Sequence, residues 1–261
     1  MEPILKAVIL GAIQGLTEFL PVSSSGHLLL GRKILGLSEA GLFLDTMLHF
    51  GTLLAVIAVF RRDIIAIAKR PFGKLPLLIV TGTIPTAAIG LIFKDFFEEI
   101  AVTGATVGWE FLATGIVLWL ADNIKNRGIK DIGDITYRDA FIVGTLQGAA
   151  ILPAISRSGL TVAGSLFRGI DRKTAATFSF LLSVPAIMGA VVLQGAELFE
   201  GKAETIGILP LVLGTLTAAV TGYIAVKWMI EIIRRGSLKG FAVYVWVLGI
   251  GTLVAQLLGK F

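Results

Sequence analysis

Long apolar stretches separated by short charged loops make up most of this chain, and their length predicts helices that cross a membrane. None of the stretches alternates apolar and polar residues with the period of two that marks a half-buried strand. We therefore predict an all-α polytopic membrane protein with six transmembrane helices, over about residues 41–60, 75–93, 103–121, 174–193, 206–226 and 241–258.

Two further apolar segments, residues 3–37 and 137–167, are each interrupted by a polar turn. Pro21 ends the helix in the first segment, and Pro153 lies in the break of the second. The pieces beside a break are too short for a clean crossing, which takes roughly 20 helical residues. Irregular backbone at membrane depth is tolerated only where it is buried in protein or lines a wet cavity. We therefore expect two re-entrant helical hairpins.

The two interrupted segments are related by an internal repeat at an offset of 133 positions. Each half of the chain has one hairpin followed by three spans, so that repeat 1 covers about residues 1–130 and repeat 2 about 134–261. An odd number of crossings inverts the second repeat in the membrane relative to the first. We expect a single membrane domain, residues 1–261, made of two inverted-topology repeats.

The charges in the loops predict the orientation of the protein. Lys and Arg gather after the first, third and fifth spans, and the loops between them are acidic. Because cytoplasmic loops carry the excess of Lys and Arg, these three loops are expected inside and both termini outside. The first hairpin then enters from outside and the second from the cytoplasm, and their tips meet near the midplane. Arg32 and Lys33 are the exceptions to this pattern.

Composition agrees with an integral membrane protein. Hydrophobic residues make up 55% of the chain and charged residues 16%, and the mean hydropathy is +0.87. The net charge of +5 is explained by the positive loops, so we expect no nucleic acid as a partner. The chain has no cysteine, which rules out disulfides and metal sites with thiolate ligands.

The breaks of the two hairpins contain the residues most suited to chemistry. Ionisable side chains inside a membrane are costly and usually functional, which singles out Glu18, His27 and Arg157. Ser24 precedes His27 by three residues, so a hydroxyl could lie within reach of a base. The guanidinium of Arg157 suits bidentate recognition of phosphate. Substrate-binding roles are expected for the other polar and small residues of the breaks: Gln14, Ser23, Ser25, Gly26, Gln147, Ser156, Ser158 and Gly159.

These residues also have structural explanations. Glu18 could be a structural partner of Arg157 or of His27, and the serines at 23–25 could merely cap the helix that follows them. Capping and binding are compatible, because a helix N-terminus with free N–H groups is itself an anion site. Asp45 and His49, four residues apart on the first span, are weaker candidates that could equally form a polar contact between helices. The residues alone predict a membrane protein with a buried anion site, best suited to phosphate.

At these residues the chain resembles the bacterial undecaprenyl-pyrophosphate phosphatase family. The likeness extends over the whole chain in length, span number and repeat spacing, and it is carried by Gln14-x-x-x-Glu18, Pro21-Val-Ser-Ser-Ser-Gly-His27 and Pro153-x-x-Ser156-Arg157-Ser158-Gly159. It implies an enzyme of the bacterial inner (cytoplasmic) membrane that hydrolyses undecaprenyl diphosphate to undecaprenyl phosphate and inorganic phosphate, recycling the carrier lipid for cell-wall synthesis. It also implies a site open to the extracytoplasmic side and a requirement for Mg²⁺ or Ca²⁺.

Carried over by position, Ser24, His27, Glu18 and Arg157 are the catalytic residues, and Glu18 is the expected metal ligand. Gln14 stands where many members have Glu, and a neutral amide is a weaker ligand for a hard cation. We expect an in-line phosphoryl transfer in which Ser24 attacks the terminal phosphorus, His27 takes its proton and Arg157 holds the diphosphate. Glu18 would orient His27 or, with a cation, bridge the phosphates. His27 as the nucleophile is an open alternative.

The expected partners are the polyprenyl diphosphate lipid and the bilayer, and the chain could also form a homodimer. A transporter or flippase for an anionic polyprenyl phosphate or a small phosphate compound is the second hypothesis, because inverted repeats are typical of transporters. Phosphate release by the purified protein distinguishes the two hypotheses.

Overall fold

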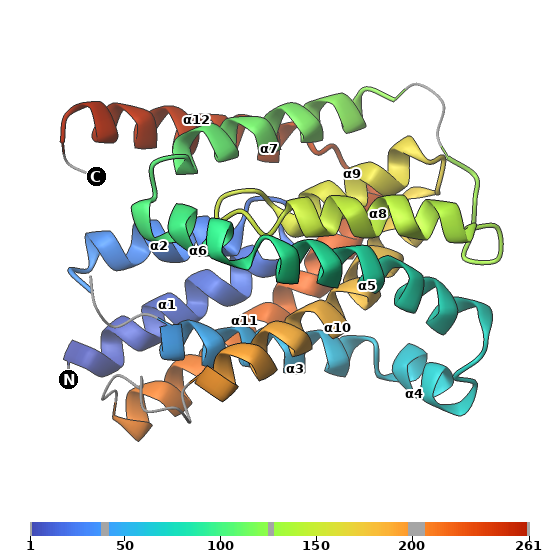
Figure 1. Cartoon of the computed structure of the whole chain (residues 1–261), viewed down its shortest axis with the longest axis horizontal. Coiled ribbons are helices and arrows are strands. Elements are labelled where there is room, and N and C mark those ends of the chain that lie inside the picture. The colour runs from blue at the N-terminus through green and yellow to red at the C-terminus, as the bar shows by residue number, and fades with distance from the viewer. Residues whose placement is uncertain (1, 38–41, 125–127, 198–206, 260–261) are drawn as a thin grey trace.

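The computed structural model describes residues 2–37, 42–124, 128–197 and 207–259, which fold into α-helices joined by short loops (Figure 1). The predicted all-α class is thereby confirmed. The helices are α1 (Glu2–Phe19), α2 (Ser24–Ile34), α3 (Leu42–Val59), α4 (Arg61–Lys69), α5 (Lys74–Ile92), α6 (Lys94–Thr103), α7 (Val107–Asp122), α8 (Tyr137–Ala149), α9 (Arg157–Phe167), α10 (Arg172–Glu197), α11 (Ile208–Arg235) and α12 (Lys239–Leu257). Some predictions fall outside the described residues, namely the span starts at Gly41 and Ile206 and the loop charges of Lys125, Arg127, Glu200, Lys202 and Glu204.

Four helices, α5, α10, α11 and α12, are long and apolar enough to cross a membrane, and α3 with α4 would make a fifth span bent by 78°. The described residues therefore hold four or five candidate spans, where the sequence predicted six. One difference lies at the predicted span 103–121, because α7 has only 16 residues, fewer than the roughly 20 of a full crossing. Gly104, with a φ of 62° in the left-handed region, ends α6, so that α6 and α7 are two separate helices. The other difference is the predicted span 41–60, which counts as a candidate only when α3 is taken together with α4.

Two of the predicted loops contain helices. The loop after the first predicted span forms α4, and the loop after the second forms α6. α4 combines Ile64 and Ile65 with Arg61 and Arg62, and it has no buried residue. A short helix that carries both apolar and charged residues suits a membrane surface. The sequence prediction, which divided the chain only into spans and loops, did not include these short helices.

The outer faces of the long helices are apolar. On α12, Val243, Val247, Ile250 and Val254 are all exposed and follow one another at helical spacing. A protein surrounded by water rarely exposes a continuous apolar stripe of this kind. The largest buried cluster instead centres on α10, so the apolar surface of α12 is left for contact with lipid.

Both predicted hairpin segments fold as two helices joined by a short turn, α1 with α2 and α8 with α9. Ser23 Oγ accepts a hydrogen bond from the N–H of Gly26 at 3.3 Å and caps α2. Ser156 Oγ accepts one from the N–H of Gly159 at 3.1 Å and caps α9, so the repeated serine and glycine serve the same purpose twice. Figure 1 shows the two pairs reaching the middle of the molecule from opposite ends, α1 and α2 from the left and α8 and α9 from the right.

Glycines allow the first helix of each hairpin to lie directly against another helix. A Cβ on Gly11 of α1 would lie 2.3 Å from the carbonyl oxygen of Gly214 in α11. A Cβ on Gly144 of α8 would lie 1.9 Å from the carbonyl oxygen of Gly82 in α5. In both contacts the obstacle is backbone, which cannot rotate away as a side chain could. α1 therefore packs along α11, and α8 packs along α5.

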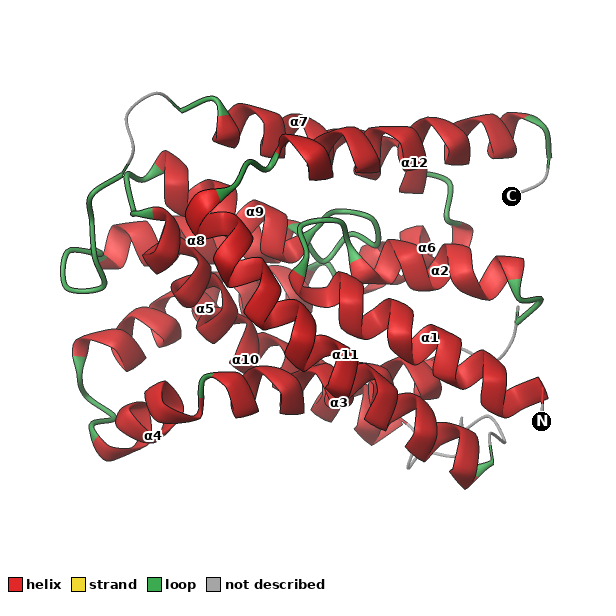
Figure 2. Ribbon diagram, turned by 180° about the vertical axis from the view of Figure 1, so that it is seen from behind, coloured by secondary structure: helices red, strands yellow, loops and turns green. Residues whose placement is uncertain are grey.

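Helices α7 and α12 form a second close pair, in which the Nε1–H of Trp246 donates to the carbonyl oxygen of Leu112 at 3.1 Å. Gly108 and Gly249 let the two backbones approach each other. Figure 2 shows this pair along the top of the molecule, with the loops that join α1 to α2 and α8 to α9 near its middle. The α7–α12 pair therefore lies beside the tips of both hairpins.

Asp139, in the first turn of α8, ties the second hairpin to the loops around it. Its buried carboxylate accepts hydrogen bonds from Lys130 Nζ at 3.0 Å and Arg168 Nε at 2.7 Å, and it forms a capping box with Thr136. Burial alone would raise the pKa of Asp139, but the hydrogen bonds from Lys130, Thr136 and Arg168 lower this pKa well below its ordinary value. The start of the hairpin is therefore anchored by a charge network.

Candidate active site

The tips of the two hairpins are bonded to each other. Ser23 Oγ, from the first tip, donates to the carbonyl oxygen of Pro153 in the second at 2.7 Å. In return Ser158 Oγ, at the start of α9, donates to the carbonyl oxygen of Leu20 at 2.9 Å. These two hydrogen bonds hold the polar residues of both breaks together in one cluster, although 130 and 138 positions separate the partners in the sequence.

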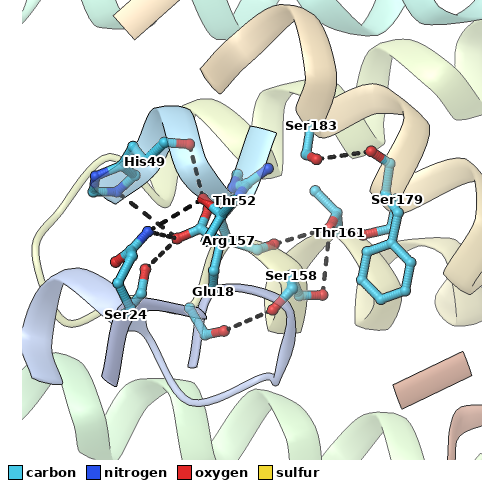
Figure 3. A network of polar contacts seen from close by, with 12 residues as sticks. Glu18, Ser24, His49, Thr52, Arg157, Ser158, Thr161, Ser179 and Ser183 are labelled. Atoms are coloured by element: carbon cyan, nitrogen blue, oxygen red, sulfur yellow. Dashed lines mark hydrogen bonds and ion pairs between the residues drawn. The ribbon is translucent and has the colours of Figure 1, made fainter. Parts of the chain in front are cut away.

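The carboxylate of Glu18 lies at the centre of this cluster of polar side chains (Figure 3). Its Oε1 is paired with the guanidinium of Arg157 from the other hairpin. Its Oε2 accepts hydrogen bonds from Ser24 Oγ and from Gln14 Nε2, the second at 2.9 Å. The Glu18 side chain is 4% exposed and that of Arg157 18%, so this ion pair is largely shielded from water. A hydroxyl, a carboxylate and a guanidinium are thus in direct contact.

Helix α3 supplies a further side to the site. His49 Nε2 lies 3.8 Å from Glu18 Oε2, and its Nδ1 lies 2.8 Å from the carbonyl oxygen of Asp45. Thr52 Oγ1 donates to the carbonyl oxygen of His49 at 2.9 Å. The sequence ranked His49 only as a weak candidate, whereas the structure brings its ring to the central carboxylate. The Asp45 side chain is directed elsewhere, to Arg32.

His27 has other partners than the sequence predicted. Its Nδ1 lies 2.6 Å from the carbonyl oxygen of Ser23, and since a carbonyl only accepts, this nitrogen carries the hydrogen. Its Nε2 lies 2.8 Å from the hydroxyl of Tyr244 on α12, whose ring is stacked on the imidazole. Both ring nitrogens are therefore engaged away from Ser24. Deprotonation of Ser24 by His27 stays a prediction, and in this geometry Glu18 is the group that receives the Ser24 hydrogen bond.

The remaining predicted binding residues divide between the site and the helix packing. Ser156 and Ser158 lie beside the Arg157 pair, with their hydroxyl oxygens 3.3 Å apart. Ser25 is exposed at the start of α2, and Gly26 is packed beneath the ring of Phe111. Gln147 is buried between helices, where its Nε2 donates to Thr86 Oγ1 on α5 at 3.2 Å. The Gln147 contact thus belongs to the α5–α8 packing and not to the Glu18 cluster.

Ser23 has a strained backbone conformation. Its φ is 67°, and among the described residues it is the one position other than glycine with a positive φ. Such a conformation costs of order 1–3 kcal/mol and persists only when the surroundings impose it. Here the bonds from Ser23 to Gly26 and Pro153 impose it, and the next residue is Ser24. Strain directly before a candidate nucleophile is a usual feature of functional sites.

Polar contacts continue from Arg157 into the helices behind it. Thr161 Oγ1 donates to the carbonyl oxygen of Arg157 at 2.9 Å, and it lies 2.5 Å from Ser179 Oγ on α10 (Figure 3). The backbone at the start of α9 is therefore fixed from the side of α10 as well.

Comparison with known proteins assigns the chain to a family. The family model described as bacitracin resistance protein BacA matches residues 7–251. The chain belongs to this family. It is 62% identical over 252 residues to undecaprenyl-diphosphatase 4 of Bacillus thuringiensis subsp. konkukian, covering 97% of each chain. The undecaprenyl-diphosphatase of Carboxydothermus hydrogenoformans is 55% identical over 258 residues, 98% of each chain. That of Halothermothrix orenii is 43% identical over 253 residues, 96% of this chain and 97% of the other.

Membership of the BacA family confirms the resemblance inferred from the two breaks and makes the chain a multi-pass membrane protein. Of the four residues that the resemblance implied as catalytic, three lie together in the structure. Glu18, Ser24 and Arg157 are in mutual contact through Glu18, whereas His27 is held by Ser23 and Tyr244.

The oxygen atoms near Glu18 can be compared with the needs of a divalent cation, which takes six or more oxygen ligands. Among the described residues, no group of three or more His, Cys, Asp and Glu side chains is arranged to hold a metal. Gln14 Oε1 is buried without a hydrogen-bond partner, beside the Glu18 carboxylate. Glu18 and Gln14 thus offer carboxylate and amide oxygens, which are ligand types that a hard cation takes, but they are fewer than its coordination requires.

Three residues at the site were missed by sequence reasoning. Tyr244 of α12 holds His27, and Glu110 and Thr114 of α7 hold the loop before Arg157. Glu110 carried a usable signal, because it is a carboxylate inside a predicted span. Nothing in the local pattern of Thr114 or Tyr244 distinguishes them from other polar residues of apolar helices.

Proposed function

We propose that this protein is an undecaprenyl diphosphatase, which hydrolyses undecaprenyl diphosphate to undecaprenyl phosphate and inorganic phosphate. The observation that carries the proposal is the contact of Ser24 Oγ with a Glu18 carboxylate that is itself paired with Arg157. It is supported by the 62% identity over 97% of the chain to a protein named undecaprenyl-diphosphatase 4. A hydroxyl nucleophile, a proton acceptor and a phosphate-binding guanidinium are the groups that this reaction needs.

The electrostatics of the site favour a diphosphate. α2 begins at Ser24 and α9 begins at Arg157, so two helix N-termini converge on the Glu18 cluster. Each N-terminus directs partial positive charge and backbone N–H groups toward a bound anion. The guanidinium of Arg157 would divide its hydrogen bonds between Glu18 and the phosphate oxygens, and it would neutralise charge that develops during transfer.

The chemical steps follow from the hydrogen bond between Ser24 and Glu18. Ser24 Oγ would form a bond to the terminal phosphorus while the bond from this phosphorus to the bridging oxygen breaks, and undecaprenyl phosphate would leave with the electron pair. The Ser24 proton would pass to Glu18. Water would then attack the phosphoserine, Ser24 would recover a proton, and inorganic phosphate would leave together with the proton that the hydrolysis releases.

His27 keeps two open roles, as the acceptor of the Ser24 proton or as the nucleophile itself. Either role requires its ring to leave the Tyr244 hydroxyl or the Ser23 carbonyl, because both nitrogens are engaged there. Trapping with labelled substrate, followed by mapping of the phosphorylated residue, separates the two nucleophiles. A label on Ser24 supports the scheme above, a label on His27 replaces it, and no label at either residue favours direct attack by water.

A divalent cation such as Mg²⁺ or Ca²⁺ would be held by Glu18 and Gln14 Oε1 on the protein side. When bound, it would supply positive charge to the phosphate oxygens. Removal of divalent cations with a chelator is expected to lower the rate. Gln14→Glu should then strengthen the dependence on the cation, because a carboxylate is a better ligand than an amide for a hard cation.

The membrane arrangement belongs to the same proposal: six crossings and two re-entrant hairpins in inverted repeats, residues 1–130 and 134–261. It is supported by the reciprocal contacts of Gly11 with Gly214 and of Gly144 with Gly82, because each joins a hairpin of one repeat to a span of the other. In this arrangement α7 would also cross the membrane, in addition to the five candidate spans. Both termini would be outside, and the site would open to the extracytoplasmic side.

The orientation can be tested simply because the chain has no cysteine. Phe72, in the exposed loop between α4 and α5, and Leu258, after α12, are each replaced by Cys in separate variants. An impermeant thiol reagent added to intact cells is expected to label Leu258→Cys and not Phe72→Cys. The reverse pattern would invert the proposed topology.

The function is tested by phosphate release from a C55 or C15 isoprenoid diphosphate by purified protein in detergent. Wild type is expected to release phosphate, and Ser24→Ala and Arg157→Ala are each expected to lose at least about 10²-fold in rate. A wild-type protein that moves polyprenyl phosphate across vesicle membranes without releasing phosphate would favour the transporter hypothesis instead.

A further inference from the structure

A buried carboxylate on α7 takes no part in the reaction described above. Glu110, in the first turn of α7, is 5% exposed. Its Oε1 accepts a hydrogen bond at 2.5 Å from Oγ1 of Thr106, the residue that directly precedes α7. Its Oε2 accepts a hydrogen bond at 2.6 Å from the backbone N–H of Ala154, in the loop between α8 and α9. A carboxyl group inside a membrane helix is expensive, so its retention calls for a specific role.

Thr114 lies one turn further along the same face of α7 and forms hydrogen bonds to the same loop. Its Oγ1 donates to the carbonyl oxygen of Ala154 at 3.2 Å and accepts from the backbone N–H of Ser156 at 3.1 Å. A threonine hydroxyl has one hydrogen to donate and lone pairs to accept, so both bonds can form together. Thr114 is fully buried, which keeps water from competing for these bonds.

The loop held in this way leads directly to the guanidinium of the candidate site. Glu110 and Thr114 together make three hydrogen bonds to the backbone of Ala154 and Ser156. Ser156 caps α9, and Arg157 is the first residue of that helix. The backbone of Arg157 is therefore fixed on the α7 side, while its side chain reaches across to the carboxylate in the other hairpin.

We propose that Glu110 and Thr114 are positioning residues, which hold the start of α9 so that Arg157 points at the diphosphate. The inference rests on the proposed phosphatase function and adds residues of α7 to it. Neither side chain touches the reacting atoms, so both act through Arg157. The role requires hydrogen-bond acceptors and a donor at fixed positions, and it does not require a negative charge on residue 110. Displacement of a catalytic group by about 1 Å can cost about 10²-fold in rate.

The test compares four variants with wild type by kcat/KM for a C15 diphosphate in detergent. Glu110→Ala and Thr114→Val remove the bonds to the loop and are each expected to lower kcat/KM by roughly tenfold or more. Glu110→Gln keeps an acceptor for the Ala154 N–H, and Thr114→Ser keeps the hydroxyl, so both should stay within about threefold of wild type. The matched control is Thr217→Val on α11, whose hydroxyl bonds the carbonyl oxygen of Leu213 in its own helix. This control should have wild-type activity.

The same substitutions are then made in an Arg157→Ala background, and the residual rates are compared. If Glu110 and Thr114 act through Arg157, their removal should change the residual rate by less than about twofold, because coupled positions are not additive. A residue needed only for folding would lower the rate by the same factor in both backgrounds. Thermal unfolding of each variant in detergent shows whether the protein is folded at the assay temperature.

A second readout does not depend on turnover. Inorganic pyrophosphate should raise the unfolding temperature of wild type by binding at Arg157, and this increase should be lost in Arg157→Ala and reduced in Glu110→Ala and Thr114→Val. Wild-type kcat/KM in both Glu110→Ala and Thr114→Val would overturn the inference, and so would losses from these two variants that multiply with the loss from Arg157→Ala. Loss of activity in Glu110→Gln equal to that in Glu110→Ala would also overturn it. A wild-type protein without phosphatase activity would instead overturn the proposed function.

Discussion

The ion pair between Glu18 and Arg157 joins the two hairpins, so its loss should affect stability as well as activity. We consider Arg157→Ala, Glu18→Gln and the double variant. In Arg157→Ala the Glu18 carboxylate, 4% exposed, is left without its guanidinium. The hydrogen bonds from Ser24 and Gln14 remain, and they satisfy only one of the two carboxylate oxygens.

Removal of one partner from a buried ion pair typically destabilises a protein by 3–5 kcal/mol. Two features of the site reduce this figure: the Arg157 side chain is 18% exposed, and His49 Nε2 lies 3.8 Å from the same carboxylate. We therefore expect Arg157→Ala to lower the free energy of unfolding by about 2–4 kcal/mol. Glu18→Gln leaves a cation that can turn toward water, so its loss should be smaller, about 1–2 kcal/mol.

The double variant distinguishes this explanation from a general loss of packing. It removes the unpaired carboxylate, so it should be more stable than Arg157→Ala alone although it contains one more substitution. Unfolding is followed by intrinsic tryptophan fluorescence in detergent, and phosphate release is measured on the same samples. All three variants should be nearly inactive. A double variant that is less stable than Arg157→Ala would refute the view that an uncompensated charge dominates the energetics.

Three further predictions concern the helix packing, the contact of His27 with Tyr244 and the charge network of Asp139. Gly144→Ala places a Cβ 1.9 Å from a backbone oxygen and should lower the free energy of unfolding by about 3 kcal/mol or more. The control is Gly251→Ala on α12, where a Cβ would lie in open space with no atom of another described helix within 4 Å, and it should be neutral or stabilising by up to about 1 kcal/mol. Thermal unfolding measures both effects. Tyr244→Phe removes the donor to His27 and should cost about 1 kcal/mol of stability, with a smaller loss of turnover than His27→Ala. Because the pKa of Asp139 is lowered in the folded protein, the stability that it contributes is complete above about pH 4 and decreases as the pH falls below this value. An unfolding midpoint measured against pH should therefore fall less steeply on the acid side in Asp139→Asn than in wild type.

The local features of this protein could be predicted from its amino-acid sequence. Long apolar runs give helices because a helix satisfies its backbone hydrogen bonds internally. Proline and a serine–glycine pair end one helix and start the next, so both hairpins could be located from their breaks. Glu18, Ser24 and Arg157 stood out as candidates because a polar group in an apolar segment is costly.

Which helices meet at the breaks could not be predicted in this way and depends on how the chain folds. His49 reaches Glu18 from α3, Glu110 and Thr114 reach the second tip from α7, and Tyr244 engages His27 from α12. These partners lie 31 to 217 positions apart, and the apolar pattern of a helix shows only that one face is buried. It does not show which neighbour covers that face, because contact with lipid and contact with another helix favour similar residues. The pairing is set instead by close backbone contacts and by hydrogen bonds between distant elements, which exist only once the chain has folded.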